Sequence, residues 1–214
     1  MEYFIANLDR IAAATLRHLE ICAISLAFAM VIGIVLGIIA AKLRSLSFVI
    51  LGAVSLIYTI PTLAMFGLMI PILGLGTVPA ISAIVLYSLL PLAQNTYSGI
   101  VNVSEETLEA ARGIGMSPMQ MLFRVELPLA TVVLSAGIRT AVVNAVGMST
   151  LASLIGAGGL GDLVFRGIST VSLTVVMAGS IPVVTIAVLA DITLRALEKR
   201  LELRLGQSRT QLAT

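Results

Sequence analysis

The stretch Ser104–Pro128, SEETLEAARGIGMSPMQMLFRVELP, is a long polar interruption between apolar runs, and it decides how the chain is organised. Its first part has the signals of a helix start. The Ser104 hydroxyl is placed to accept from free backbone N–H groups, and Glu105 and Glu106 lie in the first turn, where negative charge is favoured. The sequence therefore predicts a short capped helix here, not slack linker.

A second short helix is predicted after two glycines that loosen the chain. Ser117 and Gln120 have the spacing of a capping box, in which each side chain bonds a backbone N–H of the other residue. Pro118 follows at the first helical position, where its missing N–H costs nothing. We expect this helix to end at Pro128.

The composition places the chain in a membrane. Of 214 residues, 58% are hydrophobic and 11% charged, with mean hydropathy +1.08, whereas soluble domains carry about 25% charged residues. Apolar runs of about 20 residues fit helices and not barrel strands, so the predicted fold class is an all-α integral membrane protein. The net charge of +2 comes without a basic patch, which argues against nucleic-acid binding. Cys22 and His18 stand alone, so we expect no disulfide framework, no metal site and an interfacial histidine.

Five transmembrane helices are predicted. They cover about residues 19–41, 48–70, 80–101, 129–155 and 171–194. Pro61 and Pro91 lie inside the second and third spans and should kink or break them. Residues 1–18 mix charges with apolar residues at helical spacing, which indicates an interfacial N-terminal helix. The membrane domain then covers 19–205, and 206–214 form a flexible cytoplasmic tail.

Basic residues predict the orientation, because cytoplasmic loops are enriched in Lys and Arg. With the polar loop inside, the cytoplasmic side holds nine of them: Lys42, Arg44, Arg112, Arg124, Arg195, Lys199, Arg200, Arg204 and Arg209. The outside holds three: Arg10, Arg17 and Arg166. Arg139 stays within a span, where we expect it to snorkel or to pair with a groove carboxylate or the partner subunit. The N-terminus is therefore predicted outside and the C-terminus inside.

The polar loop also resembles a known motif. Glu109-Ala110-Ala111, then Gly115, then Leu127-Pro128 have the spacing of the cytoplasmic "EAA" loop of ABC-importer permeases, with Val125 where that pattern usually has Ile. The resemblance implies the type I ABC-importer permease fold, with the loop 104–128 as a coupling helix seated in a groove of an ATPase subunit. The residues implied in coupling are Glu109, Ala110, Ala111, Gly115, Met116, Ser117 and Pro118. The alternative interpretation is that this loop is only an amphipathic connector between two spans.

A second resemblance concerns the run Gly156–Gly161, GAGGLG. It matches the glycine fingerprint of dinucleotide sites, but no strand–helix unit or following acid accompanies it, so we expect a tight re-entrant turn of small residues. With Ala136–Thr140, Arg166–Ile168, Ile60–Thr62 and Ser117–Phe123, the sequence resembles permeases for glycine betaine, choline, carnitine and related osmoprotectants over about residues 19–205. Methionine permeases share the GAGGLG turn.

No catalytic set is present in the sequence. It has no G-x-x-x-x-G-K-[ST] loop for ATP and only one histidine, so we predict a non-catalytic subunit without cofactors. The resemblance implies partners that supply the missing functions: two copies of a cytosolic ATP-binding subunit, a second permease subunit (identical or paralogous) and an extracytoplasmic solute-binding protein. The expected location is the bacterial cytoplasmic (inner) membrane, as a multi-pass protein.

Polar side chains within spans indicate a pathway or helix–helix contacts, because they are costly in lipid. The candidates for a translocation pathway are Tyr58, Pro61, Tyr87, Asn95, Asn144 and Met148, with Gln94, Tyr97 and Ser149 as weaker ones. Tyrosine faces suit a quaternary ammonium solute by cation–π attraction, although the chain has no Trp to build a tight cage. For each residue alone, a helix–helix hydrogen bond is the competing interpretation. Asp191 and Arg195, four apart on one helix, are expected to pair.

The function predicted from the sequence is the transmembrane permease subunit of an ATP-driven ABC importer, passing a small compatible solute such as glycine betaine, carnitine or choline delivered by a binding protein. Three alternatives stay open. They are a permease for another small solute such as an amino acid of the methionine type, a stand-alone gradient-driven carrier, and a membrane scaffold that does not transport. A gradient-driven carrier would normally show internal repeats and buried ionisable residues.

Overall fold

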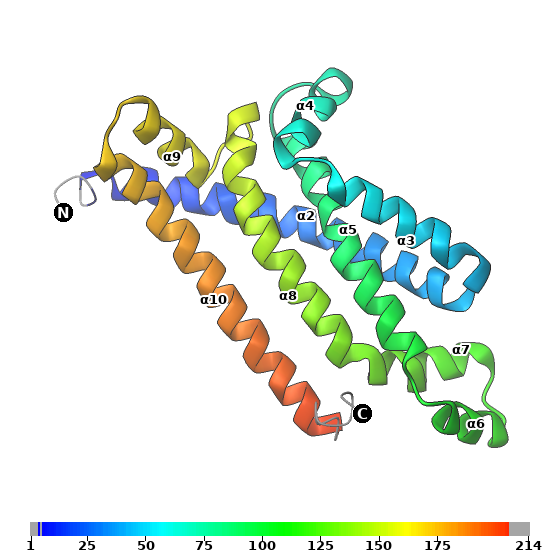
Figure 1. The fold of residues 1–214 in the computed structure, drawn as a ribbon. Coiled ribbons are helices and arrows are strands. Elements are labelled where there is room, and N and C mark those ends of the chain that lie inside the picture. The colour runs from blue at the N-terminus through cyan, green and yellow to red at the C-terminus, as the bar shows by residue number, and fades with distance from the viewer. Residues whose placement is uncertain (1–3, 5, 206–214) are drawn as a thin grey trace.

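The computed structural model describes residue 4 and residues 6–205, and every regular element in that part of the chain is helical (Figure 1). The predicted flexible tail, 206–214, lies outside the described residues. The elements are α2 (Leu8–Lys42), α3 (Arg44–Thr59), α4 (Thr62–Leu73), α5 (Thr77–Val101), α6 (Glu105–Gly113), α7 (Pro118–Met121), the π-helix η1 (Leu122–Glu126), α8 (Leu127–Ala152), the short 3₁₀ turn η2 (Ser153–Ile155), α9 (Leu160–Ser169) and α10 (Leu173–Leu205).

The membrane spans agree with the sequence in number and order. Four stretches are long and apolar enough to cross a bilayer: Leu8–Lys42, Thr77–Val101, Pro118–Ile155 and Leu173–Leu203. The pair α3 and α4 makes a fifth if the two are counted as one bent span. Residues 8–18 and the first predicted span form one continuous helix, α2.

Proline breaks the second predicted span, as expected. The axes of α3 and α4 differ by 100° at Ile60–Pro61, whose backbone is extended. Helical geometry is disfavoured for a residue that precedes proline, which is why α3 ends before Pro61. Pro91, in contrast, lies inside α5, which continues through it.

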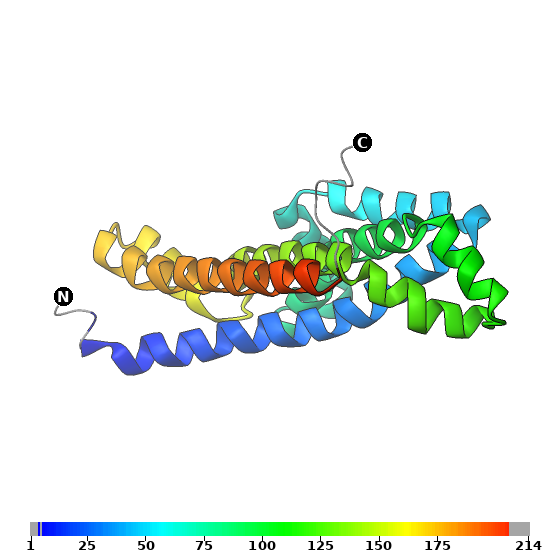
Figure 2. The ribbon, with the colours of Figure 1, turned by 90° about the horizontal axis from the view of Figure 1, so that it is seen from below.

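The two ends of the bundle carry different elements. Figure 1 shows α6, α7 and the end of α10 at one end, and the start of α2 with α9 at the other. Figure 2 shows α2 along one face and α3 on the opposite face, with α5 between them. The polar loop and the end of α10 therefore share one side, as the charge distribution predicts.

Helix α5 is the centre of the bundle and packs at backbone distance on two neighbours. A side chain built at Gly37 of α2 would lie 2.5 Å from the Cβ of Thr96 and 2.7 Å from the carbonyl oxygen of Ala93, both on α5. On the other side, Gly137 of α8 is equally close to the Pro91 carbonyl. Small residues allow such approach, which favours helix association in lipid.

The GAGGLG turn is a tight reversal, as predicted. Gly156, Gly158 and Gly159 have φ of +82°, +84° and +94°, values that side chains rarely tolerate. The turn leads into α9, which packs on α10 where Gly167 and Gly179 leave room for the neighbouring backbone.

We predict that Gly37→Ala lowers the free energy of unfolding by about 1–3 kcal/mol, the usual cost of overpacking. The added methyl group would meet the backbone of α5. The measurement is the thermal unfolding midpoint of the purified chain in detergent. Gly52→Ala on α3 is the matched control, because a Cβ there meets nothing within 4 Å; equal midpoints for the two variants would contradict the packing argument.

Candidate functional site: the elbow and the membrane hollow

The polar loop forms an elbow of two short helices, α6 and α7, and both predicted caps are present. The Ser104 side chain accepts from the backbone N–H of Thr107, and Arg112 pairs with Glu105 at 2.6 Å. The Ser117 hydroxyl accepts from the Gln120 N–H, and the Gln120 side chain accepts from the Ser117 N–H. These short-range bonds fix the shape of the elbow.

Gly115 makes the bend between α6 and α7. Its φ is +81°, in the left-handed region, and no atom lies within 4 Å of the place where a Cβ would stand. The neighbouring Gly113 has ordinary helical geometry and is also open. Conformation, not space, therefore requires glycine at 115.

The expectation that the second helix ends at Pro128 is wrong. The chain continues from α7 through the π-helix η1 into α8. The Leu127 N–H donates to the Leu122 carbonyl, five residues back, so the backbone is wider there. Pro128 follows in the first turn of α8, where a missing N–H is tolerated. The elbow is consequently joined to α8 without a break.

The surface of the elbow mixes polar and apolar groups. Of the residues predicted to couple, Glu109, Ala110, Gly115, Ser117 and Pro118 are exposed, Met116 is half-buried and Ala111 is buried. Three large apolar side chains of the same segment are also largely exposed: Ile114, Met119 and Phe123. Contiguous exposed apolar patches are a feature of protein–protein and membrane contact sites.

A hollow of about 800 Å³ lies where the bend between α3 and α4 faces α5 and α8. Its lining residues carry no charge: Tyr58, Thr59, Ile60, Pro61, Thr62, Tyr87, Val143, Asn144, Gly147, Met148, Thr150 and Leu151. The structure thus brings together five of the six residues named as pathway candidates. The sixth, Asn95, lies elsewhere and donates to the Pro91 carbonyl of its own helix at 2.7 Å.

Two tyrosines dominate the hollow. The rings of Tyr58 and Tyr87 are 5.6 Å apart between centroids and tilted by 52°. Asn144 donates to the Tyr58 hydroxyl at 3.3 Å. The Tyr87 hydroxyl is buried and has no hydrogen-bond partner within the described part of the chain. Aromatic faces and spare polar groups of this kind can contact a small polar or cationic solute.

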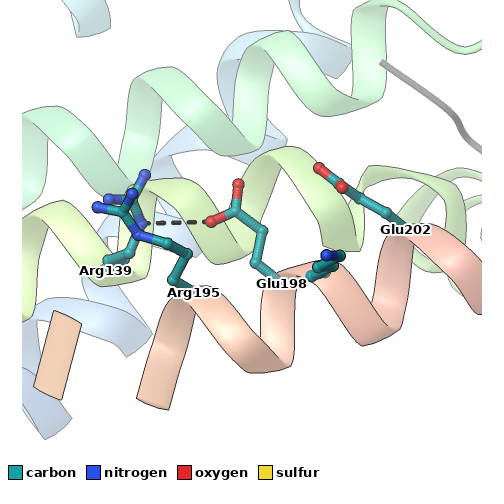
Figure 3. Close-up of a pocket in the computed structure, with 5 residues that line it drawn as sticks. Arg139, Arg195, Glu198 and Glu202 are labelled. Carbon is teal, nitrogen blue, oxygen red and sulfur yellow. Dashed lines mark hydrogen bonds and ion pairs between the residues drawn. The ribbon is translucent and has the colours of Figure 1, made fainter. Parts of the chain in front are cut away.

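A charged cluster ties the middle of α8 to the second half of α10 (Figure 3). Arg139 of α8 bonds Asp191 at 3.1 Å and Glu198 at 3.2 Å, and Asp191 also binds Arg195. The predicted pair of Asp191 with Arg195 is confirmed, and Arg139 pairs with two carboxylates of its own chain, on α10. Glu198 is buried, so an opposite charge beside it is required.

The structure contains contacts that sequence reasoning missed. Lys42 binds the buried Glu126, 84 residues away. Arg17 donates to the Ala157 carbonyl at 3.3 Å and to the Thr77 hydroxyl, and so joins α2 to the GAGGLG turn and to the start of α5. In the sequence, Lys42 and Arg17 are basic residues at the ends of predicted spans. Their charge indicates the orientation of the chain but not their bonding partners.

His18 is not interfacial, contrary to expectation. It is completely buried, because Gly159 has no side chain and lets the turn close over α2. Cys22 is buried as well and lies 3.1 Å from the Ser149 hydroxyl. Among the described residues no group of His, Cys, Asp and Glu is arranged to hold a metal ion.

Comparison with known proteins decides the family. The family model "Binding-protein-dependent transport system inner membrane component" matches residues 33–203. The chain belongs to this family. It is therefore a transport component and a multi-pass protein of the cytoplasmic membrane, and membership supports an importer subunit over a carrier that works alone.

Curated relatives match over nearly the whole chain. The choline transport system permease protein OpuBB of Bacillus subtilis is 38% identical, over 94% of this chain and 93% of its own length. The osmoprotectant import permease protein OsmW of Salmonella typhimurium is 39% identical, over 92% and 94%. The glycine betaine/carnitine/choline permease protein OpuCD of Bacillus subtilis is 40% identical, over 93% and 87%.

Solved structures agree on the fold. An inward-facing form of the MetNI methionine ABC transporter superposes with TM-score 0.83 at 22% identity, over 94% of this chain and 99% of that one. An amino acid ABC transporter structure gives TM-score 0.73 at 18% identity, over 94% and 97%. The predicted type I permease fold is confirmed.

We predict that Arg139→Leu lowers the thermal unfolding midpoint by several degrees, because it removes the positive charge beside the buried Glu198. Arg195→Leu is the control, since its pair with Asp191 is more exposed and exposed pairs contribute little. Both midpoints are measured in the same detergent. If the control variant unfolded at the lower temperature, Glu198 would not depend on Arg139.

Proposed function

We propose that this chain is the permease subunit of an ATP-driven importer for a small quaternary ammonium solute such as choline, glycine betaine or carnitine. The names of three relatives at 38–40% identity mention such solutes or osmoprotectants. The observation that carries the proposal within the chain is the uncharged hollow lined by Tyr58 and Tyr87. Its walls offer aromatic faces to a cation and hold no carboxylate that would retain it.

The energy source in this proposal is a pair of cytosolic ATP-binding subunits. The elbow is the part that receives their movement. Its exposed apolar side chains Ile114, Met119 and Phe123 provide contact area, and its two capped helices form a firm attachment. Glu109 lies on the exposed side of α6, where it can meet the ATPase surface. Catalysis of ATP hydrolysis belongs to those subunits.

The remaining partners follow from the same proposal. The elbow and the end of α10 face the cytoplasm, and the start of α2 faces outward, in agreement with the distribution of Lys and Arg. A solute-binding protein delivers solute on the outer side. A second permease subunit, identical or paralogous, completes the pathway beside the hollow.

The decisive experiment is uptake into proteoliposomes that contain this chain with an ATPase subunit and a binding protein from the same organism. We expect ATP-dependent accumulation of choline, glycine betaine or carnitine, and none of methionine. Uptake of methionine would mean that the solute is an amino acid and not a quaternary ammonium compound. Accumulation by the chain alone, driven by an ion gradient, would overturn the importer assignment.

We predict that Gly115→Val lowers uptake about tenfold, because a β-branched residue at φ +81° is strained by about 1–2 kcal/mol. The variant should still reach the membrane, since the added side chain meets no atom within 4 Å. Gly113→Ala is the control, with ordinary φ and equal space. Radiolabelled uptake is compared at equal amounts of membrane protein. Wild-type uptake by Gly115→Val would show that the bend has no part in coupling.

We predict that Tyr87→Phe slows uptake about threefold while raising the thermal unfolding midpoint. The hydroxyl lacks an internal partner, so its loss removes a burial cost of about 1–3 kcal/mol. Transport suffers because a passing solute loses a hydrogen bond. Tyr97→Phe, which alters a tyrosine of α5 outside the hollow, is the control. Unchanged uptake with raised stability would mean that the hydroxyl does not contact solute.

A further inference from the structure

The pair Lys42–Glu126 joins the end of α2 to the segment that follows the elbow. The Lys42 ammonium lies 2.7 and 2.5 Å from the two carboxylate oxygens of Glu126. The Glu126 side chain is only 5% exposed, and that of Lys42 is 38% exposed. A buried carboxylate is costly without a close cation, so the two groups hold each other firmly in place.

The position of the pair is unusual. Glu126 is the last residue of η1, the π-helix between the elbow and α8. An apolar cluster lies beside it, drawn from four elements: Ile38 and Ala41 of α2, Ile100 of α5, Leu122 of η1, and Leu127 and Ala130 of α8. The ends of three spans therefore meet where the elbow joins the bundle.

A π-helix, η1, separates the elbow from α8. A π-turn inside an α-helix is rare, often occurs at functional sites and is one of the usual places where a helix kinks. If η1 bent, it would absorb the movement of the elbow, and the helices of the bundle would not move. A bond from Glu126 to Lys42 opposes this, because it fixes the end of η1 to a second helix.

Helix α2 connects this end of the bundle to the other. It is continuous over Leu8–Lys42, packs on α5 through Gly33 and Gly37, and at its far part holds the GAGGLG turn through Arg17 (Figure 1). A displacement of Lys42 would therefore be carried along α2 to Ala157 and to Thr77, at the start of α5.

We propose that the Lys42–Glu126 ion pair transmits movement of the elbow to α2, and that α2 carries it to the GAGGLG turn at the opposite end. This inference rests on the proposed function, since it assumes that the elbow is driven by ATP-binding subunits. Lys42 and Glu126 are positioning residues: they touch neither solute nor nucleotide, and their effect is on the amount of solute moved per ATP hydrolysed.

The test is charge reversal in the full complex of permease, ATPase and binding protein in proteoliposomes. Lys42→Glu and Glu126→Lys should each lower solute uptake per ATP about tenfold, with ATPase activity kept within about twofold, a usual size for coupling between sites. The double swap should return the ratio to within about threefold of wild type, because the pair is rebuilt with its charges exchanged. Arg44→Glu is the control: it reverses an exposed charge two residues from Lys42, at the start of α3, and the Arg44 side chain makes no ion pair among the described residues.

A second variant separates transmission from folding. Lys42→Met with Glu126→Met fills a similar volume without charge, a change that is often neutral for stability. We expect this complex to assemble and unfold at the wild-type temperature but to take up about tenfold less solute per ATP. Normal uptake per ATP by this variant or by the single reversals overturns the inference. Single variants that lose uptake and ATPase together, without rescue by the swap, also overturn it, because the pair would then only hold the fold.

Failure of the proposed function would look different. In that case the wild-type complex itself shows no ATP-dependent uptake, and no variant is needed to see it. If the wild-type complex takes up solute and the charge-reversal variants have the same uptake per ATP, only the inferred transmission through α2 is wrong.

Discussion

Close approach of helix backbones is the constraint on which the fold depends. In lipid, burying apolar side chains against one another gains little, because the hydrocarbon is equally apolar. Helices are then held where small residues let main chains touch. Four glycines do this at the two contacts of α5. Gly33 and Gly37 lie at its contact with α2, and Gly99 and Gly137 lie at its contact with α8. Helix α5 becomes the fixed member of the bundle, and the place of the hollow and of the elbow follows from it.

Charge is used differently from apolar packing in this chain. The buried carboxylates Glu126 and Glu198 are each held by a basic residue from another helix. The hollow, in contrast, is lined by neutral groups. Fixed charges therefore bind helices together outside the hollow, and the space through which solute is proposed to pass is free of them.

Local rules predicted a large part of the structure. Ser104, Ser117 and Gln120 cap helices as expected because capping depends on residues three apart, and Pro61 bends the chain because its effect falls on the preceding residue. The prediction that a helix ends at Pro128 is wrong. The π-turn just before Pro128 places it in the first turn of α8, where proline is tolerated.

Long-range features could not be predicted in the same way. The pairing of Lys42 with Glu126 depends on how two spans pack, and a sequence pattern of one span does not contain that information. The hollow is an intermediate case. Polar residues costly in lipid marked Tyr58, Tyr87 and Asn144 as candidates, but Asn95 satisfies the same rule by bonding its own helix.

The length of α2 has a consequence of its own. Its 35 residues extend about 52 Å at 1.5 Å per residue, whereas bilayer hydrocarbon is about 30 Å thick. A straight rod longer than the layer it crosses must lean or protrude, and its inclination then follows the thickness of the surrounding lipid. In lipids with longer acyl chains, such a helix would be less tilted from the bilayer normal. Because one helix spans the distance from Arg17 to Lys42, a change in lipid would be felt at both faces of the membrane together.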